Sequence, residues 1–482
     1  MASVKSWRLG EAGAPAFPDD FEIVKKCALQ VTDIKTNHNK YYALELHRAT
    51  VSGAPTFRVF THYGRTDDLE TNPNAGMKEC RYAATQAEAD GIYMSLYREK
   101  TSPRKGYKEL SLASSRIGSQ KARGTSAGEI DAKTVQRLAE QRAARGETPL
   151  PVAPKVTLDP RLADLVQYIY AEATDALTEA VNVRITAHGI ETPLGILTLG
   201  QIEKGEAILQ DLYRLFQAGS SNRTKMQELS SDFYTVIPHR IGRTRTAIQD
   251  AVIDSMEAFQ GRQETLQLMK DMLQVNGDSG SVLFDGETDA RYAALGCDIG
   301  PLDPASSTYQ EIERYVLERQ VKTKGIKVKA VYTLRREAEH QVFTQHIGNQ
   351  RLLFHGSRIK NWVGILSRGI LLPKIVVSLG VNRTDAGWLG NGIYFGDASC
   401  TSAYYTSPGR KKTRFMAVAR VALGTMKEYT KITYGLSGPP PGYDSCHGVR
   451  HTPKTPSQFA DDEFVVYDAR QQRLEYLVEF TL

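Results

Sequence analysis

The hydrophobic residues of this chain change their period along its length, and this change constrains the fold most strongly. In residues 158 to 290 apolar residues recur every three or four positions, as in Leu162, Leu165 and Ile169, which is the spacing of an amphipathic helix. In residues 297 to 482 they alternate with polar ones, as in the final LEYLVEFTL, which is the two-residue period of a half-buried strand. The pattern predicts a helical bundle followed by a mostly antiparallel α+β domain.

The preceding part of the chain predicts a short N-terminal segment (1 to 20), a small α+β module (21 to 110) and a linker (111 to 157). The module holds the strand-like stretches KYYALELHRA and TFRVFTHYGR, followed by TQAEADGIYMSLYREKT with helical spacing. The linker is rich in basic residues, proline and small polar residues, with a short helix expected around AKTVQRLAEQRAA. With the bundle at 158 to 296 and the last domain at 297 to 482, the fold class is α+β and multidomain.

Capping residues mark the ends of two predicted helices in the bundle. Asp159 followed by Pro160 is typical of a helix start, and Thr198 with Gln201 has the spacing of a capping box. Gly219 follows the apolar stripe of the second helix and predicts its end.

Composition excludes several classes of protein. The five cysteines are widely separated and none forms a CxxC pair, so neither a disulfide framework nor a zinc finger is expected. Cys446, His447 and His451 supply three possible metal ligands where a structural zinc site needs four, so a polar loop is favoured and no metal is expected. No secretory signal or membrane-spanning stretch is visible, which predicts an intracellular protein without membrane association. The net charge of +6 permits an anionic partner without requiring one.

Three stretches of the last domain carry a resemblance to a known family. They are FHGSR at 354 to 358, GNGIYFGDASCTSAYY at 390 to 405 and DDEFVVYD at 461 to 468. Together they resemble the His, Tyr, Glu signature of the diphtheria-toxin-like ADP-ribosyltransferases, specifically the poly(ADP-ribose) polymerases of the compact type without zinc fingers. Residues 158 to 482 resemble the helical regulatory and catalytic domains of that family. The N-terminal module resembles its WGR domain, with Tyr63 where the namesake tryptophan would stand.

The resemblance implies that the enzyme uses NAD as a substrate and no metal, and that His355, Tyr394 and Glu463 are its catalytic residues. His355 would hydrogen-bond a ribose hydroxyl, since a neutral imidazole can both donate and accept. Glu463 would bind the 2′-hydroxyl of the donor ribose and polarise the attacking hydroxyl. From the residues alone, a structural histidine and a solvated acidic turn are the alternatives.

The same resemblance implies a set of NAD-binding residues, in which Gly356 pairs its backbone with the carboxamide and Tyr394 and Tyr405 enclose the nicotinamide. The set is His355, Gly356, Ser357, Tyr394, Ser402 and Tyr405. Spacing alone places Ser402 and Tyr405 on one face of a helix capped by Asp397, and it leaves the tyrosines open to a role as core residues.

The resemblance further implies activation by DNA strand breaks, which loosen a helical lid over the NAD site. Tyr63 and Arg65 are the candidate DNA contacts, through stacking and through phosphate. Expected partners are DNA breaks and acceptor proteins, including the chain itself, which is expected to be monomeric without DNA. The expected location is DNA-associated, in a nucleus or in a bacterial cytoplasm and nucleoid.

Glu463 favours polymer formation, whereas Thr401 stands where close relatives often carry a lysine. Transfer of a single ADP-ribose, or a catalytically idle scaffold that binds DNA ends, are the alternatives.

Overall fold

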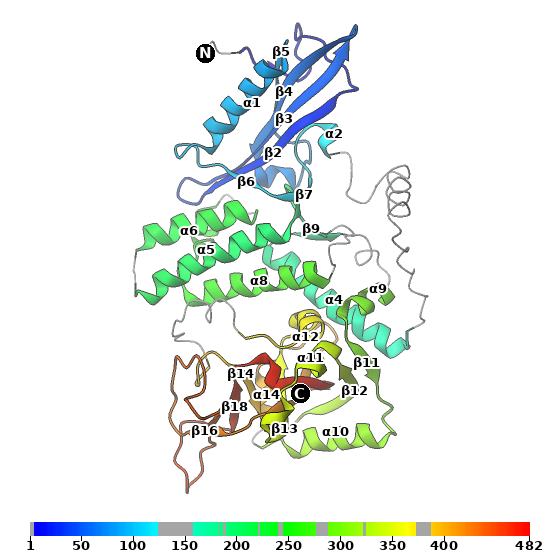
Figure 1. Ribbon diagram of the computed structural model, residues 1–482, viewed down its shortest axis with the longest axis vertical. Coiled ribbons are helices and arrows are strands. Elements are labelled where there is room, and N and C mark those ends of the chain that lie inside the picture. Colours follow the sequence, from blue (N-terminus) through cyan, green and yellow to red (C-terminus); the bar gives the residue numbers. More distant parts are fainter. Residues whose placement is uncertain are drawn as a thin grey trace. The chain divides into compact units, whose positions relative to one another are not determined.

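The computed structural model describes most of the chain, and the described ranges are 4–123, 158–181, 183–186, 189–219, 222–239, 244–275, 288–321, 324–372 and 387–482. The chain divides into two compact units (Figure 1). One gathers residues 4–123 and most of 177–273, and the other gathers 158–176 and 288–482. Each unit is described by itself. No helix in the described ranges is long and apolar enough to cross a membrane.

The N-terminal module is a six-stranded antiparallel sheet with the strand order β1-β5-β4-β3-β2-β6 and one long helix, α1. Its elements are β1 (Trp7–Arg8), β2 (Glu22–Asp33), β3 (His38–Val51), β4 (Ala54–Arg65), β5 (Met77–Ala83), α1 (Gln86–Thr101) and β6 (Lys108–Leu110). Helix α1 begins at a complete capping box. The Thr85 side chain accepts from the Glu88 amide, and the Glu88 carboxylate accepts from the Thr85 amide. Ala89 and Tyr93 of α1 are buried against the sheet, which builds the core of this module.

Residues 111 to 123 are folded, where the sequence predicts the start of a linker. Strand β7 (Leu112–Ser115) pairs with β10 (Gly195–Leu197), and α2 (Gln120–Arg123) follows it. The Ser119 amide and hydroxyl both donate to the buried carboxylate of Glu45, at 2.7 and 2.6 Å. These partners lie about 80 residues away in either direction, so a local reading of composition does not reveal them. The helix predicted around AKTVQRLAEQRAA lies outside the described residues.

The helical region contains the predicted amphipathic helices and also three short strands, which form a four-stranded sheet with β7 in the order β7-β10-β9-β8. Its elements are α4 (Pro160–Val181), β8 (Arg184–Thr186), β9 (Gly189–Thr192), β10 (Gly195–Leu197), α5 (Leu199–Gln217), α6 (Arg223–Val236), α7 (Arg245–Asp250) and α8 (Met256–Val275).

The structure confirms the predicted helix ends, with one difference. Helix α4 begins at Pro160, and Gly219 lies just beyond α5 with a φ of +60°. Thr198 caps α5 by accepting from the Gln201 amide. The Gln201 side chain does not return that bond, because it is buried and joins the Ser111 amide to the Val236 carbonyl.

The N-terminal module and the helices share one compact unit because α6 covers a free strand edge. Strand β6 pairs with β2 only as far as Gln30, so the next amides of β2 have no strand partner on that side. There the Thr32 amide donates to Thr235 Oγ1 at 2.8 Å, and the Ile34 amide donates to Ser231 Oγ at 3.1 Å. Side chains of α6 thus complete the hydrogen bonding of the sheet.

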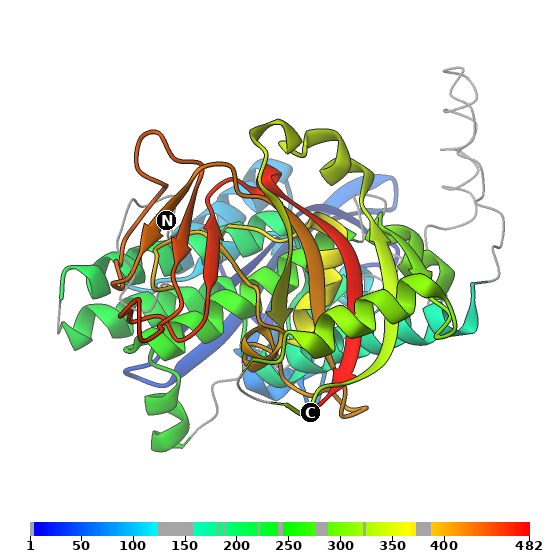
Figure 2. The same cartoon turned by 90° about the horizontal axis from the view of Figure 1, so that it is seen from below.

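The C-terminal domain is a nine-stranded sheet with the order β11-β12-β19-β15-β13-β14-β18-β17-β16, antiparallel throughout except for the pair β16 and β17. Its strands are β11 (Asp298–Pro301), β12 (Lys327–Arg335), β13 (Gln350–Ser357), β14 (Ile393–Gly396), β15 (Arg414–Ala422), β16 (Met426–Tyr429), β17 (Ser445–Gly448), β18 (Glu463–Val466) and β19 (Gln472–Thr481). Its helices are α9 (Thr288–Leu295), α10 (Ser307–Glu318), α11 (Glu337–Val342), α12 (Trp362–Arg368) and α14 (Ser399–Tyr404). Figure 2 shows β19, in red, between β12 and β15.

The core of this domain explains why the strand pattern was visible in the sequence. Helix α10 packs its apolar stripe, which includes Ile312 and Val316, against alternate residues of the central strands, among them Val418, Val478 and Phe480. Strands β12 and β19 therefore mostly alternate buried and partly exposed residues, whereas β15 is buried on both faces along Phe415–Ala419 and has a continuous apolar run there. The predicted multidomain α+β class, with a mostly antiparallel final domain, is confirmed.

Candidate active site

Strand β13 carries the FHGS stretch, and its last residues lie where two strands separate. The strand is in register with β15 along its whole length, but it meets β14 at a single pair, Phe354 and Gly396. Beyond that pair β13 and β14 diverge, while β14 keeps its pairing with β18 on its other edge. His355 therefore stands at the point of divergence.

His355 bridges the two diverging strands through its side chain. Its Nδ1 lies 2.9 Å from the carbonyl oxygen of Tyr394. A carbonyl only accepts, so Nδ1 carries the proton and Nε2 is left as an acceptor. Burial lowers the pKa of His355 below its ordinary value, against the opposing effect of this hydrogen bond, so the ring is neutral at pH 7. A neutral imidazole in this tautomer can orient a bound hydroxyl group by accepting its hydrogen bond at Nε2.

Tyr394 on β14 is held as a rigid ring. Its hydroxyl donates to the Gly390 carbonyl at 2.7 Å and accepts from the Leu389 amide at 2.9 Å. A side chain at Gly387 would overlap the ring, since a Cβ there would come within 2.1 Å of it. The ring position is thus set by the loop before β14.

Glu463 opens β18, directly opposite Gly396 in the ladder with β14. Tyr394 and Gly396 are two residues apart on β14, and Val465, opposite Tyr394, is two residues after Glu463, so the side chains of Tyr394 and Glu463 lie on the same face. Burial raises the pKa of Glu463 from 4.5 to about 7, and the negative charge of Asp461 adds to the effect. The negative charge of Glu463 in turn helps to raise the pKa of Tyr394.

Helix α14 brings Ser402 and Tyr405 to the same place. Ser402 is buried, whereas Tyr405, just after the helix, is 66% exposed. The prediction that Asp397 caps this helix is wrong. The N-cap residue is Ala398, without a side-chain capping bond, because the Asp397 carboxylate accepts from Arg450 at 2.8 Å instead.

Gly356 has a reason for being glycine that the sequence did not reveal. A Cβ at this position would lie 1.8 Å from the carbonyl oxygen of Ser402, so β13 packs directly on the backbone of α14. The next residue, Ser357, accepts from the Asn361 side chain at 3.1 Å, and its carbonyl accepts from the indole of the buried Trp362. The end of β13 is therefore supported on both sides.

Two further residues, Asp461 and Arg450, lie in this region and were not predicted from the sequence to belong to the site. Asp461 is 8% exposed and accepts from the Thr401 hydroxyl at 2.6 Å, so it does not lie in the solvated acidic turn that was the alternative from the residues alone. Arg450 lies between the carboxylates of Asp397, Asp461 and Asp462. The run of three acidic residues at the start of an apolar strand could have indicated buried carboxylates here. Such a run is, however, more typical of a solvated turn.

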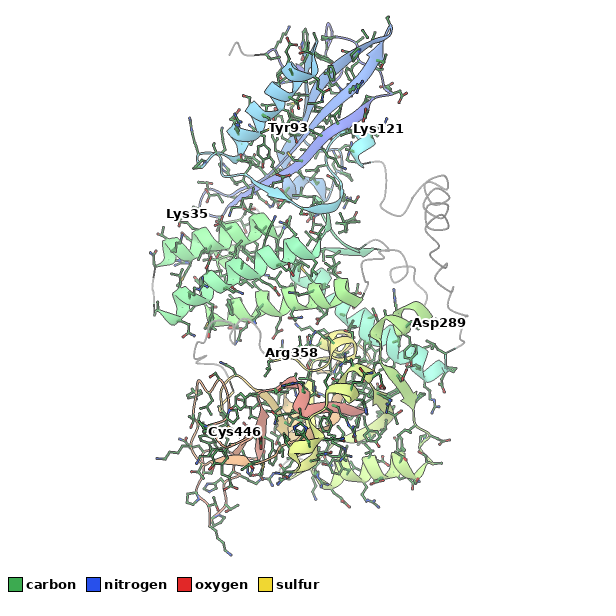
Figure 3. All side chains as sticks on the ribbon, in the orientation of Figure 1. Lys35, Tyr93, Lys121, Asp289, Arg358 and Cys446 are labelled. Atoms are coloured by element: carbon green, nitrogen blue, oxygen red, sulfur yellow. The ribbon has the colours of Figure 1, made fainter. Side chains whose placement is uncertain are left out.

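The cysteine and histidine segment flagged in the sequence does not gather into a metal site. Cys446, labelled in Figure 3, is fully buried, and His447 Nε2 contacts Asp462 at 2.7 Å. His451 contacts the Ser457 carbonyl. In the part of the chain that the structure describes, no group of three or more His, Cys, Asp or Glu side chains is arranged to hold a metal ion.

Tyr63 and Arg65, the candidate DNA contacts, lie on β4 of the N-terminal module. Tyr63 stacks on Tyr42 with ring centroids 5.5 Å apart and donates to Glu79 at 3.0 Å. Arg65 donates to Asp67 and to the backbone and side chain of Asn37, so its guanidinium is held within the module.

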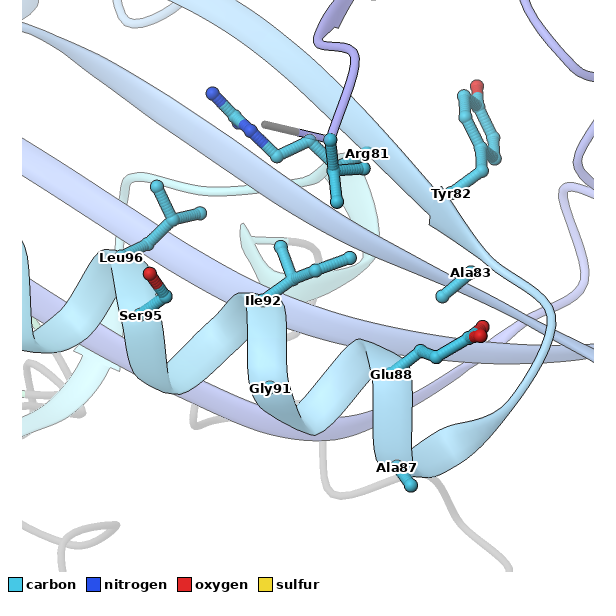
Figure 4. Close-up of a pocket in the computed structure, with 10 residues that line it drawn as sticks. Arg81, Tyr82, Ala83, Ala87, Glu88, Gly91, Ile92, Ser95 and Leu96 are labelled. Atoms are coloured by element: carbon cyan, nitrogen blue, oxygen red, sulfur yellow. The ribbon is translucent and has the colours of Figure 1, made fainter. Parts of the chain in front are cut away.

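The face around Tyr63 is hollowed and charged. A cavity of about 610 Å³ is lined by Tyr42 and Tyr63 together with more basic than acidic side chains. The basic ones are Lys40, Arg81, Lys100, Arg104 and Lys105, and the acidic ones are Asp33, Glu79 and Glu99. A second cavity, of about 780 Å³, lies between α1 and β5 and is mainly apolar, with Ile92 and Leu96 in its wall (Figure 4).

Comparisons with known proteins match three parts of the chain to described domains. Residues 306–482 match the poly(ADP-ribose) polymerase catalytic domain, 156–277 the poly(ADP-ribose) polymerase regulatory domain, and 25–113 the WGR domain.

Curated relatives match two thirds or more of the chain with moderate identity. The protein mono-ADP-ribosyltransferase PARP4 of Mus musculus is 33% identical over 67% of this chain, and PARP4 of Homo sapiens is 28% identical over 97% of it. The poly [ADP-ribose] polymerase 2-A of Oryza sativa subsp. japonica is 26% identical over 93% of this chain and 68% of its own length. The chain spans only 16% of the mouse protein and 25% of the human one.

Proposed function

This chain belongs to the poly(ADP-ribose) polymerase family, since it carries the WGR, regulatory and catalytic domains of that family in order, and we propose that it transfers ADP-ribose from NAD to protein acceptors with release of nicotinamide. Two observations support the proposal: His355 bonds the Tyr394 carbonyl where β13 and β14 part, and the side chains of Tyr394 and Glu463 lie on one face of the β14–β18 ladder.

The chemistry of NAD cleavage matches the groups that converge there. The bond between the ribose C1′ and the nicotinamide nitrogen breaks with its electron pair leaving on nicotinamide, through an oxocarbenium-like transition state. We propose that His355 Nε2 accepts from a ribose hydroxyl and that the exposed Tyr405 ring stacks on nicotinamide opposite Tyr394. Gly356, Ser357 and Ser402 would complete the NAD site.

Glu463 is proposed to act in its ionised form on two hydroxyl groups. It would accept from the 2′-hydroxyl of the donor ribose, and it would take up the proton of the attacking acceptor hydroxyl as the new bond to C1′ forms. A carboxyl group with a pKa of about 7 is well matched to that task near neutral pH.

We further propose that the transfer is repeated on the growing chain, so that a polymer forms. The presence of Glu463 supports elongation by the resemblance described above. Transfer of a single unit is the second candidate, because the mouse and human relatives described above are named mono-ADP-ribosyltransferases and because position 401 is threonine. A catalytically idle scaffold is the third.

DNA strand breaks are the proposed activator, and the WGR domain is their proposed binding site. The cavity around Tyr63 supports this, since cationic side chains and stacked aromatic rings are what single-stranded or frayed ends require. Arg65 would act mainly by holding the strand end against the loop at Asn37. A DNA-associated, intracellular location and modification of the chain by itself follow from the same proposal.

Labelled NAD tests these proposals in one experiment. The purified chain is incubated with the label, with and without nicked duplex DNA, and the products are separated by size. We expect a ladder that grows when nicked DNA is present. A single shifted band would show transfer of one ADP-ribose unit and contradict elongation. If no protein carries the label, the enzyme proposal is contradicted. Equal labelling with and without DNA would contradict activation by DNA. Glu463→Gln serves as the control, with NAD binding retained and the ladder lost.

A further inference from the structure

Three consecutive acidic residues lead into β18, and each has a different environment. Asp462 is paired, since its Oδ1 accepts from His447 Nε2 at 2.7 Å and from the Arg450 amide at 3.0 Å. Asp461 is buried and accepts from the Thr401 hydroxyl at 2.6 Å. Among the described residues, no lysine or arginine forms an ion pair with Glu463. The three acids therefore differ in their partners.

The charge around Glu463 is only partly compensated. Arg450 is shared by three carboxylates, at 2.8 Å from Asp397, 3.7 Å from Asp461 and 3.6 Å from Asp462. One guanidinium cannot neutralise three carboxylates, and its shortest contact goes to Asp397. Arg450 is therefore not a dedicated partner of Asp461.

Asp461 and Glu463 both face helix α14. Gly396, opposite Glu463 in the ladder, would place a Cβ 3.4 Å from Ser402 Oγ of that helix. Directly opposite residues of an antiparallel pair project to the same face, so the Glu463 side chain is also on the α14 side. Thr401, on the same helix, holds Asp461 by its hydrogen bond.

We propose that Thr401 and Asp461 are positioning residues for Glu463: the Thr401 hydroxyl fixes the Asp461 carboxylate beside Glu463, and that negative charge makes Glu463 a stronger base toward the ribose and acceptor hydroxyls. The proposal rests on the proposed function. It deepens that function by assigning the strength of the base to a pair outside the His, Tyr, Glu set.

The groups that face Glu463 support this assignment. Tyr394 from β14 and Tyr405 after α14 are neutral phenols at pH 7, so they do not oppose the charge of Asp461. The charged and titratable groups next to Asp461 and Asp462 are Arg450, Asp397 and His447. Burial is the largest cause of the raised pKa of Glu463, and the negative charge of Asp461 is the second.

The test compares two isosteric variants that each remove one negative charge next to Glu463. In Asp461→Asn the acid limb of the kcat/KM profile should move to lower pH by about one unit, and the plateau rate should fall several-fold, because the like charge is gone. In Asp462→Asn the limb should stay in place, since that charge is directed at His447. An unmoved limb in Asp461→Asn, or equal shifts in both variants, overturns the proposal.

The hydroxyl at position 401 is tested by rescue. Thr401→Val removes the hydrogen bond to Asp461 and should lower the plateau rate, while Thr401→Ser keeps the hydroxyl and should restore it. If Ser and Val behave alike, the hydroxyl has no positioning role.

A readout independent of turnover separates this proposal from the proposed function. Carboxyl NMR of the full chain with labelled glutamate, assigned through Glu463→Gln, follows the titration of Glu463 directly. We expect its midpoint near pH 7 to drop in Asp461→Asn and to remain in Asp462→Asn. A shifted midpoint without any NAD turnover in the wild-type chain would refute the proposed function alone, whereas an unshifted midpoint would refute the positioning role.

Discussion

Glu463 illustrates how position changes the chemistry of a single side chain. An exposed glutamate is ionised at neutral pH, whereas burial and the neighbouring Asp461 bring the pKa of Glu463 to about 7. Asp462 is adjacent in sequence and behaves in the opposite way: burial acts to raise its pKa, but the hydrogen bond from His447 lowers it overall. Two neighbouring carboxyl groups thus differ because their partners differ.

This difference predicts opposite effects on stability. The folded state binds the Glu463 proton more tightly than the unfolded state, so the free energy of unfolding falls as the pH rises from 4.5 to about 7 and stays low above it. Glu463→Gln does not titrate. At about pH 8 it should therefore be more stable than the wild type by up to about 3 kcal/mol, with little difference near pH 4.

Thermal unfolding of the C-terminal domain at several pH values measures this effect. Asp462→Asn is the matched control: a lowered pKa stabilises the fold above the ordinary pKa and loses that contribution as the pH falls, so this variant should be destabilised at pH 8. Equal melting temperatures for wild type and Glu463→Gln at pH 8 would show that the carboxyl group is not held in an unfavourable environment.

Between elements, the contact of β13 with α14 decides where the proposed NAD-binding residues lie. His355, Gly356 and Ser357 are on the strand and Ser402 and Tyr405 are on or next to the helix, and the two backbones touch at Gly356. A single side chain at that point would push the two groups of residues apart.

Gly356→Ala tests the contact. Its Cβ would lie 1.8 Å from a backbone carbonyl that cannot move without shifting α14, so we expect a loss of about 1–3 kcal/mol in stability and a marked loss of NAD binding. Gly396→Ala, in the adjacent strand, meets only ordinary contacts at 3.4 Å and should be much less destabilised. Chemical denaturation and calorimetric titration with NAD measure the two effects, and similar behaviour of both variants would argue against a rigid contact.

At the scale of the whole molecule, polar contacts help to join the N-terminal module and the helices in one unit. Side chains of α6 bond the free edge of β2 at Thr32 and Ile34, and Gln30 donates to the Tyr234 carbonyl. Such contacts depend on geometry, because a buried amide without its partner is costly.

Thr235→Val should uncouple this edge. The variant keeps the shape of the side chain but leaves the Thr32 amide without an acceptor, which costs about 1–3 kcal/mol. Hydrogen exchange at the Thr32 amide should become faster, while Thr235→Ser, which retains the hydroxyl, should protect it. Unchanged exchange in the valine variant would mean that the edge is held by other contacts.

The sequence by itself determined the order of the helical and strand domains, the starts of two helices and the residues that carry the family resemblance. These features depend on local chemistry: hydrophobic period, capping residues such as Thr198, and short motifs. It also predicted the three stretches from which the site is built, although their roles in NAD binding remain predictions.

Only the tertiary structure decided which distant groups became neighbours. It paired β7 with a strand about 80 residues later, placed the Ser402 carbonyl against Gly356, and turned Asp461 toward Thr401 instead of toward solvent. Asp397 does not cap the helix for the same reason, because its carboxylate accepts a hydrogen bond from the distant Arg450. Packing and the electrostatic environment arise from contacts across the chain, so no local pattern of residues encodes them.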